Sequence, residues 1–100
     1  MLYTVGTFLV KPGLESEFIA AWEAFAKWTS RQKLGGGNGI LLQDAGESQR
    51  FISFGPWTDE KVIQAWRGTA EFKSFFARAK ELCAEVRPAT MRLAAQAEDR

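Results

Sequence analysis

QRFISFGPWTDEKVIQAWRGTAEF, residues 49–72, is the stretch of the sequence that decides the fold. Its first part, Gln49–Gly55, is rich in aromatic and β-branched residues, which predicts a strand that Pro56 is expected to end. Thr58 and the two acids that follow it are typical of a helix N-terminus, so a short helix is predicted over about residues 59–67. The stretch therefore joins a strand to a helix, and a second helix follows.

Two longer amphipathic helices are predicted before and after this short helix. One spans about residues 13–32 and the other about residues 70–85, and in both the apolar residues recur at the 3.6-residue period of one helix face. The first face holds Leu14, Phe18, Ala21, Trp22, Phe25 and Trp28, and the second holds Phe72, Phe75, Phe76, Ala79, Leu82, Cys83 and Val86. Each helix is expected to bury that face against a sheet.

Three further strands complete the expected set of elements. They are residues 2–10, Ile40–Asp44, and Thr90–Ala95, the last following Pro88, which is expected to end the preceding helix. The glycine-rich segment at residues 35–39 leads from a helix into a strand and has no Lys-Ser/Thr pair after it. It is therefore interpreted as a helix exit and not as a phosphate-binding loop.

The order of these elements predicts the topology. Strand, helix, strand, strand, helix pair, strand is the ferredoxin-like order. Because crossover connections are right-handed, both helical segments are expected on one face of a four-stranded antiparallel sheet. The predicted fold class is α+β, with one domain over residues 3–95 and a polar tail over residues 96–100.

The composition excludes several classes of function. A net charge of +1 provides no basic field for nucleic acid or an anionic membrane. Histidine is absent, which removes the usual general base and the commonest metal ligand, and the single cysteine, Cys83, excludes an intrachain disulfide. No signal peptide and no apolar run of the roughly 20 residues that span a bilayer is recognised. A cytoplasmic protein without nucleic-acid or membrane partners is expected.

The sheet face that carries no helices is expected to be apolar. In the first strand, apolar residues occupy both alternating positions, with Leu2 and Phe8 on one parity and Val5 and Leu9 on the other. Because an exposed apolar sheet face exceeds what monomers usually tolerate, a homodimer that packs sheet against sheet is predicted. The alternative is a monomer with a few exposed apolar side chains.

Three short motifs, in this order along the chain, resemble the antibiotic biosynthesis monooxygenase family of dimeric α/β barrels. They are Lys11–Phe18 after the first strand, Phe51–Trp57 in the third strand, and Ala65–Phe72, in which a tryptophan is followed by a small polar turn and a phenylalanine. The resemblance covers about residues 3–95. It implies a dimeric α/β barrel with a pocket for a small apolar or aromatic molecule.

Members of this family include cofactor-free oxygenases of polyketide-like aromatics, quinol oxygenases and haem-degrading enzymes. The haem-degrading branch is marked by an asparagine on the first strand, a tryptophan before the last helix, and a histidine ten positions later. Trp66 matches the tryptophan, but Gly6 and Phe76 stand where the asparagine and the histidine would be. Because phenylalanine cannot ligate iron, no haem, and no other cofactor or metal, is expected.

Six residues are candidates for substrate binding. Aromatic side chains could form flat apolar walls, and polar ones could stabilise an anionic substrate oxygen. The aromatic candidates are Trp22, Trp66, Phe72 and Phe76, and the polar candidates are Tyr3 and Arg92, with the hydroxyls of Ser53 and Thr7 as weaker ones. The alternative assigns the aromatics to the core and the polar residues to the surface or an interface.

Two functions remain open at this point. A cofactor-independent monooxygenase of a small aromatic or quinol-like compound predicts a closed apolar cavity beside Trp66, with a polar group reaching in. A non-catalytic ligand-binding or interaction domain predicts a cavity filled by the phenylalanines. No catalytic residue is assigned, because Cys83 is expected to be an inert buried thiol and no convincing pair of carboxylates is recognised.

Overall fold

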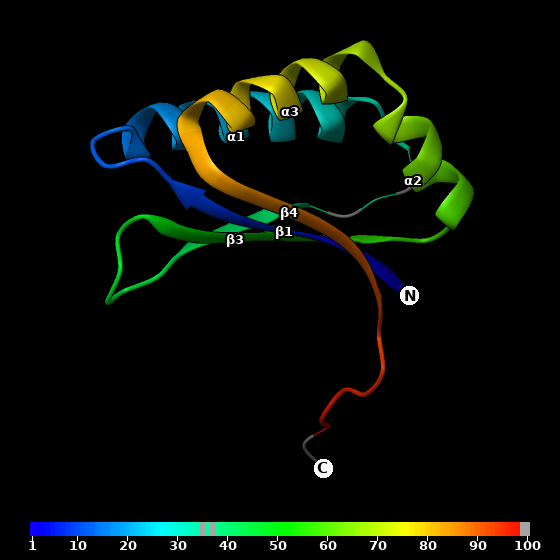
Figure 1. The fold of residues 1–100 in the computed structure, drawn as a ribbon. Coiled ribbons are helices and arrows are strands. Elements are labelled where there is room, and N and C mark those ends of the chain that lie inside the picture. Colours follow the sequence, from blue (N-terminus) through cyan, green and yellow to red (C-terminus); the bar gives the residue numbers. More distant parts are fainter. Residues whose placement is uncertain (35, 37, 99–100) are drawn as a thin grey trace.

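The chain folds as a four-stranded sheet covered by three helices on one face (Figure 1). The computed structural model describes residues 1–34, 36 and 38–98, so Gly35 and Gly37 of the predicted loop, and the last two residues of the predicted tail, lie outside the described residues. The elements are β1 (Leu2–Val10), α1 (Glu15–Arg31), β2 (Ile40–Gln43), β3 (Arg50–Trp57), α2 (Glu60–Arg67), α3 (Ala70–Leu82) and β4 (Cys83–Arg92).

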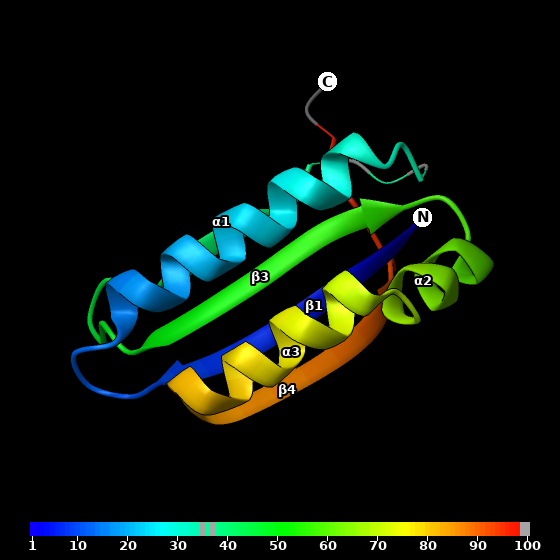
Figure 2. The same ribbon diagram turned by 90° about the horizontal axis from the view of Figure 1, so that it is seen from above.

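The strand order is β2-β3-β1-β4, and all neighbouring strands are antiparallel. Seen from the helix side, α1 and α3 lie beside each other along the strands, and α2 lies beyond the start of α3 (Figure 2). This arrangement confirms the predicted α+β, ferredoxin-like sheet with helices on one face. Residues 93–98 form no helix or strand, and the domain limits at residues 3 and 95 stay a prediction.

The last helix and the last strand correct the sequence prediction. The helix ends at Leu82 rather than near residue 85, and β4 begins at Cys83, whose backbone is extended with φ −118° and ψ 145°. Strand β4 then runs through Pro88, which was expected to precede the strand. Proline is tolerated there because β4 is an edge strand, where a missing N–H need not break a ladder.

Pro56 was also expected to end a strand, and this expectation is wrong. Strand β3 continues through Pro56 to Trp57. The ladder between β2 and β3 reaches only the pair Ile40–Phe54, and beyond it the side of β3 away from β1 is paired, within the described residues, only through a single bridge between Trp57 and Gly36. The open side accommodates the missing N–H of proline, as in an edge strand.

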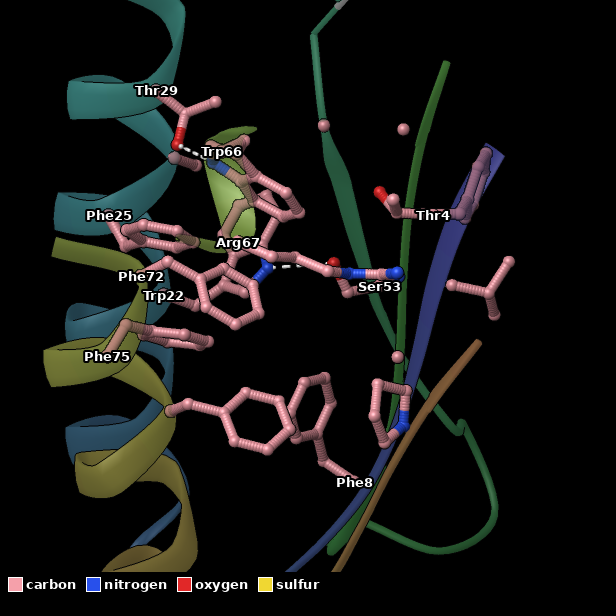
Figure 3. Close-up of a pocket in the computed structure, with 18 of the residues that line it drawn as sticks. Thr4, Phe8, Trp22, Phe25, Thr29, Ser53, Trp66, Arg67, Phe72 and Phe75 are labelled. Carbon is pink, nitrogen blue, oxygen red and sulfur yellow. Dashed lines mark hydrogen bonds between the residues drawn. The ribbon is translucent and has the colours of Figure 1, made fainter. Parts of the chain in front are cut away.

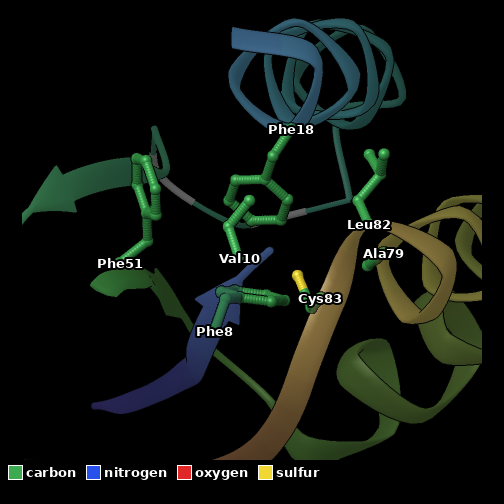
Figure 4. Close-up of a cluster of buried hydrophobic side chains, with 7 residues drawn as sticks. All are labelled: Phe8, Val10, Phe18, Phe51, Ala79, Leu82 and Cys83. Carbon is green, nitrogen blue, oxygen red and sulfur yellow. The ribbon is translucent and has the colours of Figure 1, made fainter. Parts of the chain in front are cut away.

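The most densely buried part of the molecule lies at one end of the layer between helices and sheet. Rings there pack closely, with 4.8 Å between the centroids of Phe8 and Phe18 and 5.2 Å between those of Phe18 and Phe51. This cluster contains Phe8, Val10, Phe18, Phe51, Ala79, Leu82 and Cys83 (Figure 4). Cys83 and Val86, which were predicted on a helix face, reach this region from β4 instead.

The opposite face of the sheet carries large apolar side chains, as the sequence predicted. Ile40, Leu42, Ile52 and Met91 are 40–52% exposed on it. No helix among the described residues is long and apolar enough to cross a membrane, and the cytoplasmic location stays a prediction.

Candidate functional site

Strand pairing divides the helix-facing side of the sheet into rows of large and small residues. Residues that are directly paired share a face, so each row contains one residue from β3, one from β1 and one from β4. In order, the rows are Phe51–Phe8–Val86, Ser53–Gly6–Pro88, Gly55–Thr4–Thr90 and Trp57–Leu2–Arg92. Two rows of small residues between rows with large ones leave a hollow floor under the helices.

Gly6 lies at the centre of this floor. A Cβ atom added to Gly6 would lie 2.8 Å from two ring carbons of Phe8, and Phe8 itself is only 4% exposed. The Phe8 ring therefore leans over the glycine, and no side chain fits at position 6 unless this buried ring moves. A glycine here keeps the floor of the hollow open.

A cavity of about 100 Å³ lies above this floor and opens partly to solvent. It is bounded by α1, α2 and α3 on one side and by the sheet on the other (Figure 3). A single water needs only ~10–15 Å³, whereas sites for drug-sized ligands measure ~300–1,000 Å³. The cavity therefore suits a small ligand, of about one or two rings, that extends towards the opening.

Aromatic rings that contact one another form the helix side of the cavity. Trp66 on α2 lies with its ring centroid 5.5 Å from that of Phe25 on α1 and 4.8 Å from that of Phe72 on α3. Phe72 in turn stacks on Phe76 at 5.4 Å. Such pairs prefer these spacings, so the rings hold one another in place and present flat apolar surfaces to the cavity.

Three tryptophan N–H groups at the cavity are each satisfied by a side-chain hydroxyl. A hydroxyl that accepts such a bond keeps its own hydrogen for another acceptor. All three hydroxyls line the cavity, so they are placed to donate to a bound oxygen. The pairs are Trp22 Nε1 to Ser53 Oγ at 2.9 Å, Trp66 Nε1 to Thr29 Oγ1 at 3.0 Å, and Trp57 Nε1 to Thr4 Oγ1 at 2.9 Å.

Arg67 is the one charged residue among the described residues that line the cavity. It is the last residue of α2 and is only partly exposed. Its side chain extends from the helix across the cavity towards the sheet (Figure 3). Within the described part of the chain, no hydrogen bond or ion pair is formed by its guanidinium.

The structure brings four of the six predicted candidates together. Trp22, Trp66, Phe72 and Phe76 all line the cavity, and so does Ser53, while their role in binding stays a prediction. The two polar candidates do not line it. Tyr3 belongs to the helix-free face of the sheet, as does Thr7, and Arg92 lies exposed in the outermost row of the helix-facing side.

Arg67 and the hydroxyls of Thr4 and Thr29 were not among the predicted candidates. The hydroxyls belong to the small rows or to α1, and only the strand register shows which strand positions share a row. Arg67 follows Trp66 directly, and a charged residue at the end of a helix usually indicates a solvated helix terminus. One sequence signal could have located the floor of the cavity. Two small residues, Ser53 and Gly55, occupy alternating positions of β3.

The described residues do not fit a haem or metal site. Gly6 and Phe76 both line the cavity, and neither residue has a side-chain atom that can ligate iron. No group of three or more metal-ligating side chains occurs in residues 1–34, 36 and 38–98. Burial raises the pKa of the Cys83 thiol from 9.0 to about 11, which keeps it protonated near neutral pH and therefore a poor nucleophile.

Comparisons with known proteins agree with one another. A family model described as "Antibiotic biosynthesis monooxygenase" matches residues 1–78. A relative from Bacillus subtilis (strain 168), named "Putative monooxygenase YcnE", is 32% identical over 73 residues, which cover 73% of this chain and 76% of its own.

Solved structures show the same fold at lower identity. SnoaB from Streptomyces nogalater, described as a cofactor-independent oxygenase, is similar with a TM-score of 0.87 at 17% identity, over 98% of this chain and 97% of its own. Rv0793 from Mycobacterium tuberculosis has a TM-score of 0.83 at 17% identity, over 97% and 98% of the two chains. At these identities the structures support the fold and not a particular substrate.

Proposed function

The chain belongs to the antibiotic biosynthesis monooxygenase family, and we propose that it is a cofactor-independent monooxygenase of a small aromatic or quinol-like compound. The observation that supports this proposal most is the construction of the cavity. Stacked rings offer flat apolar walls, and three hydroxyls with available hydrogens face the same space. A flat ring that carries oxygen substituents matches both features.

The proposed reaction needs no external reductant. A ring methylene next to a phenol or ketone loses a proton to give a delocalised anion, which transfers its electrons to O₂. One oxygen atom replaces the two hydrogens as a carbonyl, and the other leaves with them as water, so that R₂CH₂ and O₂ give R₂CO and H₂O. All four electrons that reduce O₂ come from the substrate.

The protein's part in this reaction is to bind the ring, stabilise its anion and exclude water. The aromatic walls bind the ring, and the hydroxyls of Ser53, Thr4 and Thr29 donate to its oxygens. No carboxylate is found among the described lining residues, so the proton leaves through water at the open side of the cavity. Substrates with acidic methylenes or phenols are therefore favoured.

Oxygen uptake tests this function directly. The purified protein is mixed with two-ring compounds, namely hydroxylated tetralones and naphthoquinols, in the presence of a metal chelator, and O₂ is followed with an electrode. Protein-dependent uptake with one product carbonyl per O₂ supports the proposal. Absence of uptake across the panel, with no aromatic bound in native mass spectrometry, overturns it in favour of a non-catalytic interaction domain.

We also propose that a second copy of the chain covers the helix-free face of the sheet. Four large apolar side chains on this face, Ile40, Leu42, Ile52 and Met91, are 40–52% exposed. Charged residues on the same face gather at one end, where Arg50 and Arg87 form ion pairs with neighbouring acids. An apolar centre with a charged end is an arrangement that a two-fold interface can bury against itself.

A further inference from the structure

We infer that Arg67 makes the cavity selective for a flat ligand that carries an anionic oxygen, either a carboxylate or a phenolate. The inference rests on the proposed function in one respect only, because it assumes that the cavity receives a small aromatic molecule. The inference specifies the charge of the ligand, which neither the fold nor the aromatic lining determines.

The surroundings of Arg67 supply the first part of the argument. Every other described residue that lines the cavity is uncharged, so no carboxylate there neutralises the guanidinium. The acids at the start of α2 do not pair with the guanidinium either. Asp59 uses its side chain to cap the helix, and Glu60 is exposed in the first turn. Without a protein partner among the described residues, the guanidinium depends on water for its hydrogen bonds.

Ligand entry changes this balance. A ring that enters the cavity displaces that water, and a neutral ring offers the guanidinium nothing in its place. An anionic oxygen replaces the lost hydrogen bonds with charge-assisted ones, in the planar geometry that guanidinium groups favour. The cavity should therefore discriminate against a neutral ligand of the same shape.

The position of Arg67 fixes where the anionic oxygen would lie. Arg67 follows Trp66, whose ring forms part of the aromatic wall, and its side chain runs from that wall towards the sheet (Figure 3). The hydroxyls of Thr4 and Ser53 lie on the sheet side of the same cavity. A ring against Trp66 would thus place an oxygen at its far edge within reach of one cation and two hydroxyl donors.

A helix terminus alone would also explain a cation at this position. The last turn of a helix stabilises a positive charge wherever its side chain points. That reading predicts no effect of Arg67 on ligand charge selection, whereas the inference above predicts a strong one. Binding of matched charged and neutral ligands separates the two.

The first experiment compares 2-naphthoate with its neutral isostere 2-naphthamide by isothermal titration calorimetry at neutral pH. We expect wild-type protein to bind the carboxylate about 10- to 100-fold more tightly than the amide, the range that one charge-assisted pair supplies. Arg67→Gln should remove this preference and leave the affinity for the amide within about twofold. An undiminished preference in Arg67→Gln would overturn the inference, and equal affinities in the wild type would exclude the carboxylate as the anionic group.

Two further variants control for net charge and for folding. Lys61→Gln removes the same charge from an exposed position on the same helix, and should keep the full preference for the carboxylate. Arg67→Lys keeps the charge without the planar fork and should keep part of it. An Arg67→Gln protein with wild-type circular dichroism but no preference supports the inference, and equal losses in Lys61→Gln would contradict it.

The second experiment distinguishes a phenolate from a carboxylate source. Binding of 4-nitrophenol is followed by the absorbance of its ionised form across the pH range of its own ionisation. A bound nitrophenol whose apparent pKa falls in the wild type, but not in Arg67→Gln, assigns Arg67 to phenolate binding. Preference for naphthoate without this shift assigns it to carboxylates, and absence of both effects refutes the inference.

These binding measurements fail independently of the oxygenase proposal. If the charge preference is found but no substrate supports oxygen uptake, the cavity is an anion-selective ligand site without the proposed activity. If neutral quinols support uptake and Arg67→Gln retains it, the oxygenase proposal stands and the role of Arg67 is wrong.

Discussion

The hydrogen bond between Trp22 and Ser53 links α1 to the floor of the cavity across 2.9 Å. Ser53→Ala removes the acceptor and leaves the indole N–H without a partner in a partly buried site. We expect a loss of about 1–2 kcal/mol in the free energy of unfolding, measured in urea. The same substitution in a Trp22→Phe background should cost at least ~0.5 kcal/mol less, because the donor is already absent. Equal costs in both backgrounds would show that the bond does not stabilise the fold.

Burial of Cys83 makes stability depend on pH in one direction. The folded thiol has a pKa of about 11 because burial disfavours the thiolate, while the ordinary value is 9.0. Between these values the unfolded chain has lost the proton that the folded chain keeps, so the free energy of unfolding falls as pH rises from about 9 to 11. The slope approaches about 1.4 kcal/mol per pH unit.

Cys83→Ala provides the control for this pH dependence, since other groups titrate in the same range. The difference between the urea-unfolding free energies of the wild type and the variant should be constant below pH 8 and should shift against the wild type above pH 9. A difference that is independent of pH up to 11 would show that the thiol titrates normally in the folded protein.

At the residue scale, the sequence located side chains whose neighbours are set by a helical period. Trp22, Phe72 and Phe76 lie at the cavity because their spacing places them on the buried faces of α1 and α3. Arg67 was missed because an arginine at the end of a helix is usually interpreted as solvated. Its direction depends on how α2 is placed against β3 and α3, which local sequence does not encode.

At the element scale, α2 and α3 are joined by Gly68 and Thr69, and the side chain of Thr69 forms hydrogen bonds to both helix ends. Thr69 Oγ1 donates to the Trp66 carbonyl at 2.7 Å and accepts from the Phe72 amide at 3.1 Å. These bonds connect the end of α2 to the start of α3, the two helices that carry Trp66, Phe72 and Phe76. Threonine is a favoured N-cap residue, so this junction has a signal in the local sequence.

Replacement of Thr69 tests the importance of that cap. Thr69→Ala should lower the free energy of unfolding by about 1–2 kcal/mol, whereas Thr69→Ser, which keeps the oxygen, should cost less than about 0.5 kcal/mol. Urea denaturation followed by circular dichroism provides both values. If alanine and serine are tolerated equally, helix packing and not the cap sets the junction.

The boundary between α3 and β4 shows where local signals mislead at this scale. Residues 83–86 continue the helical spacing of α3, so the sequence predicted a longer helix. In the structure, Cys83 and Val86 reach the buried region from a strand, paired with Val10 and Phe8 of β1. The long ladder with β1 outweighs the helical preference of four residues, and such long-range pairing is invisible to local periodicity.

At the scale of the whole molecule, the layer between helices and sheet has a filled end and a hollow end. Large residues in the row Phe51–Phe8–Val86 fill one end, and the rows with Gly6 and Gly55 leave the other open. The sequence predicted the layer but not this division, because each strand contributes only one residue to a row. The register of three strands must be known before the small residues are seen to coincide.

The other side of the same sheet provides the prediction that belongs to the whole molecule. If a second copy covers this face, the mass in solution should be about twice the 11.2 kDa of one chain, measured by sedimentation at micromolar concentration. Ile52 is 40% exposed there, and Ile52→Glu would bury an unpaired carboxylate in the interface. We therefore expect this variant to sediment as a monomer with an intact fold.

Gln64→Glu is the matched control for this test, because it adds the same charge at an exposed position on α2. It should leave the mass unchanged. The helix-facing cavity lies on the opposite side of the sheet from Ile52, so a monomeric Ile52→Glu protein should still bind 2-naphthoate if one chain forms the complete site. A monomeric wild type would refute the dimer, and loss of binding in the monomeric variant would show that the partner supports the cavity through the sheet.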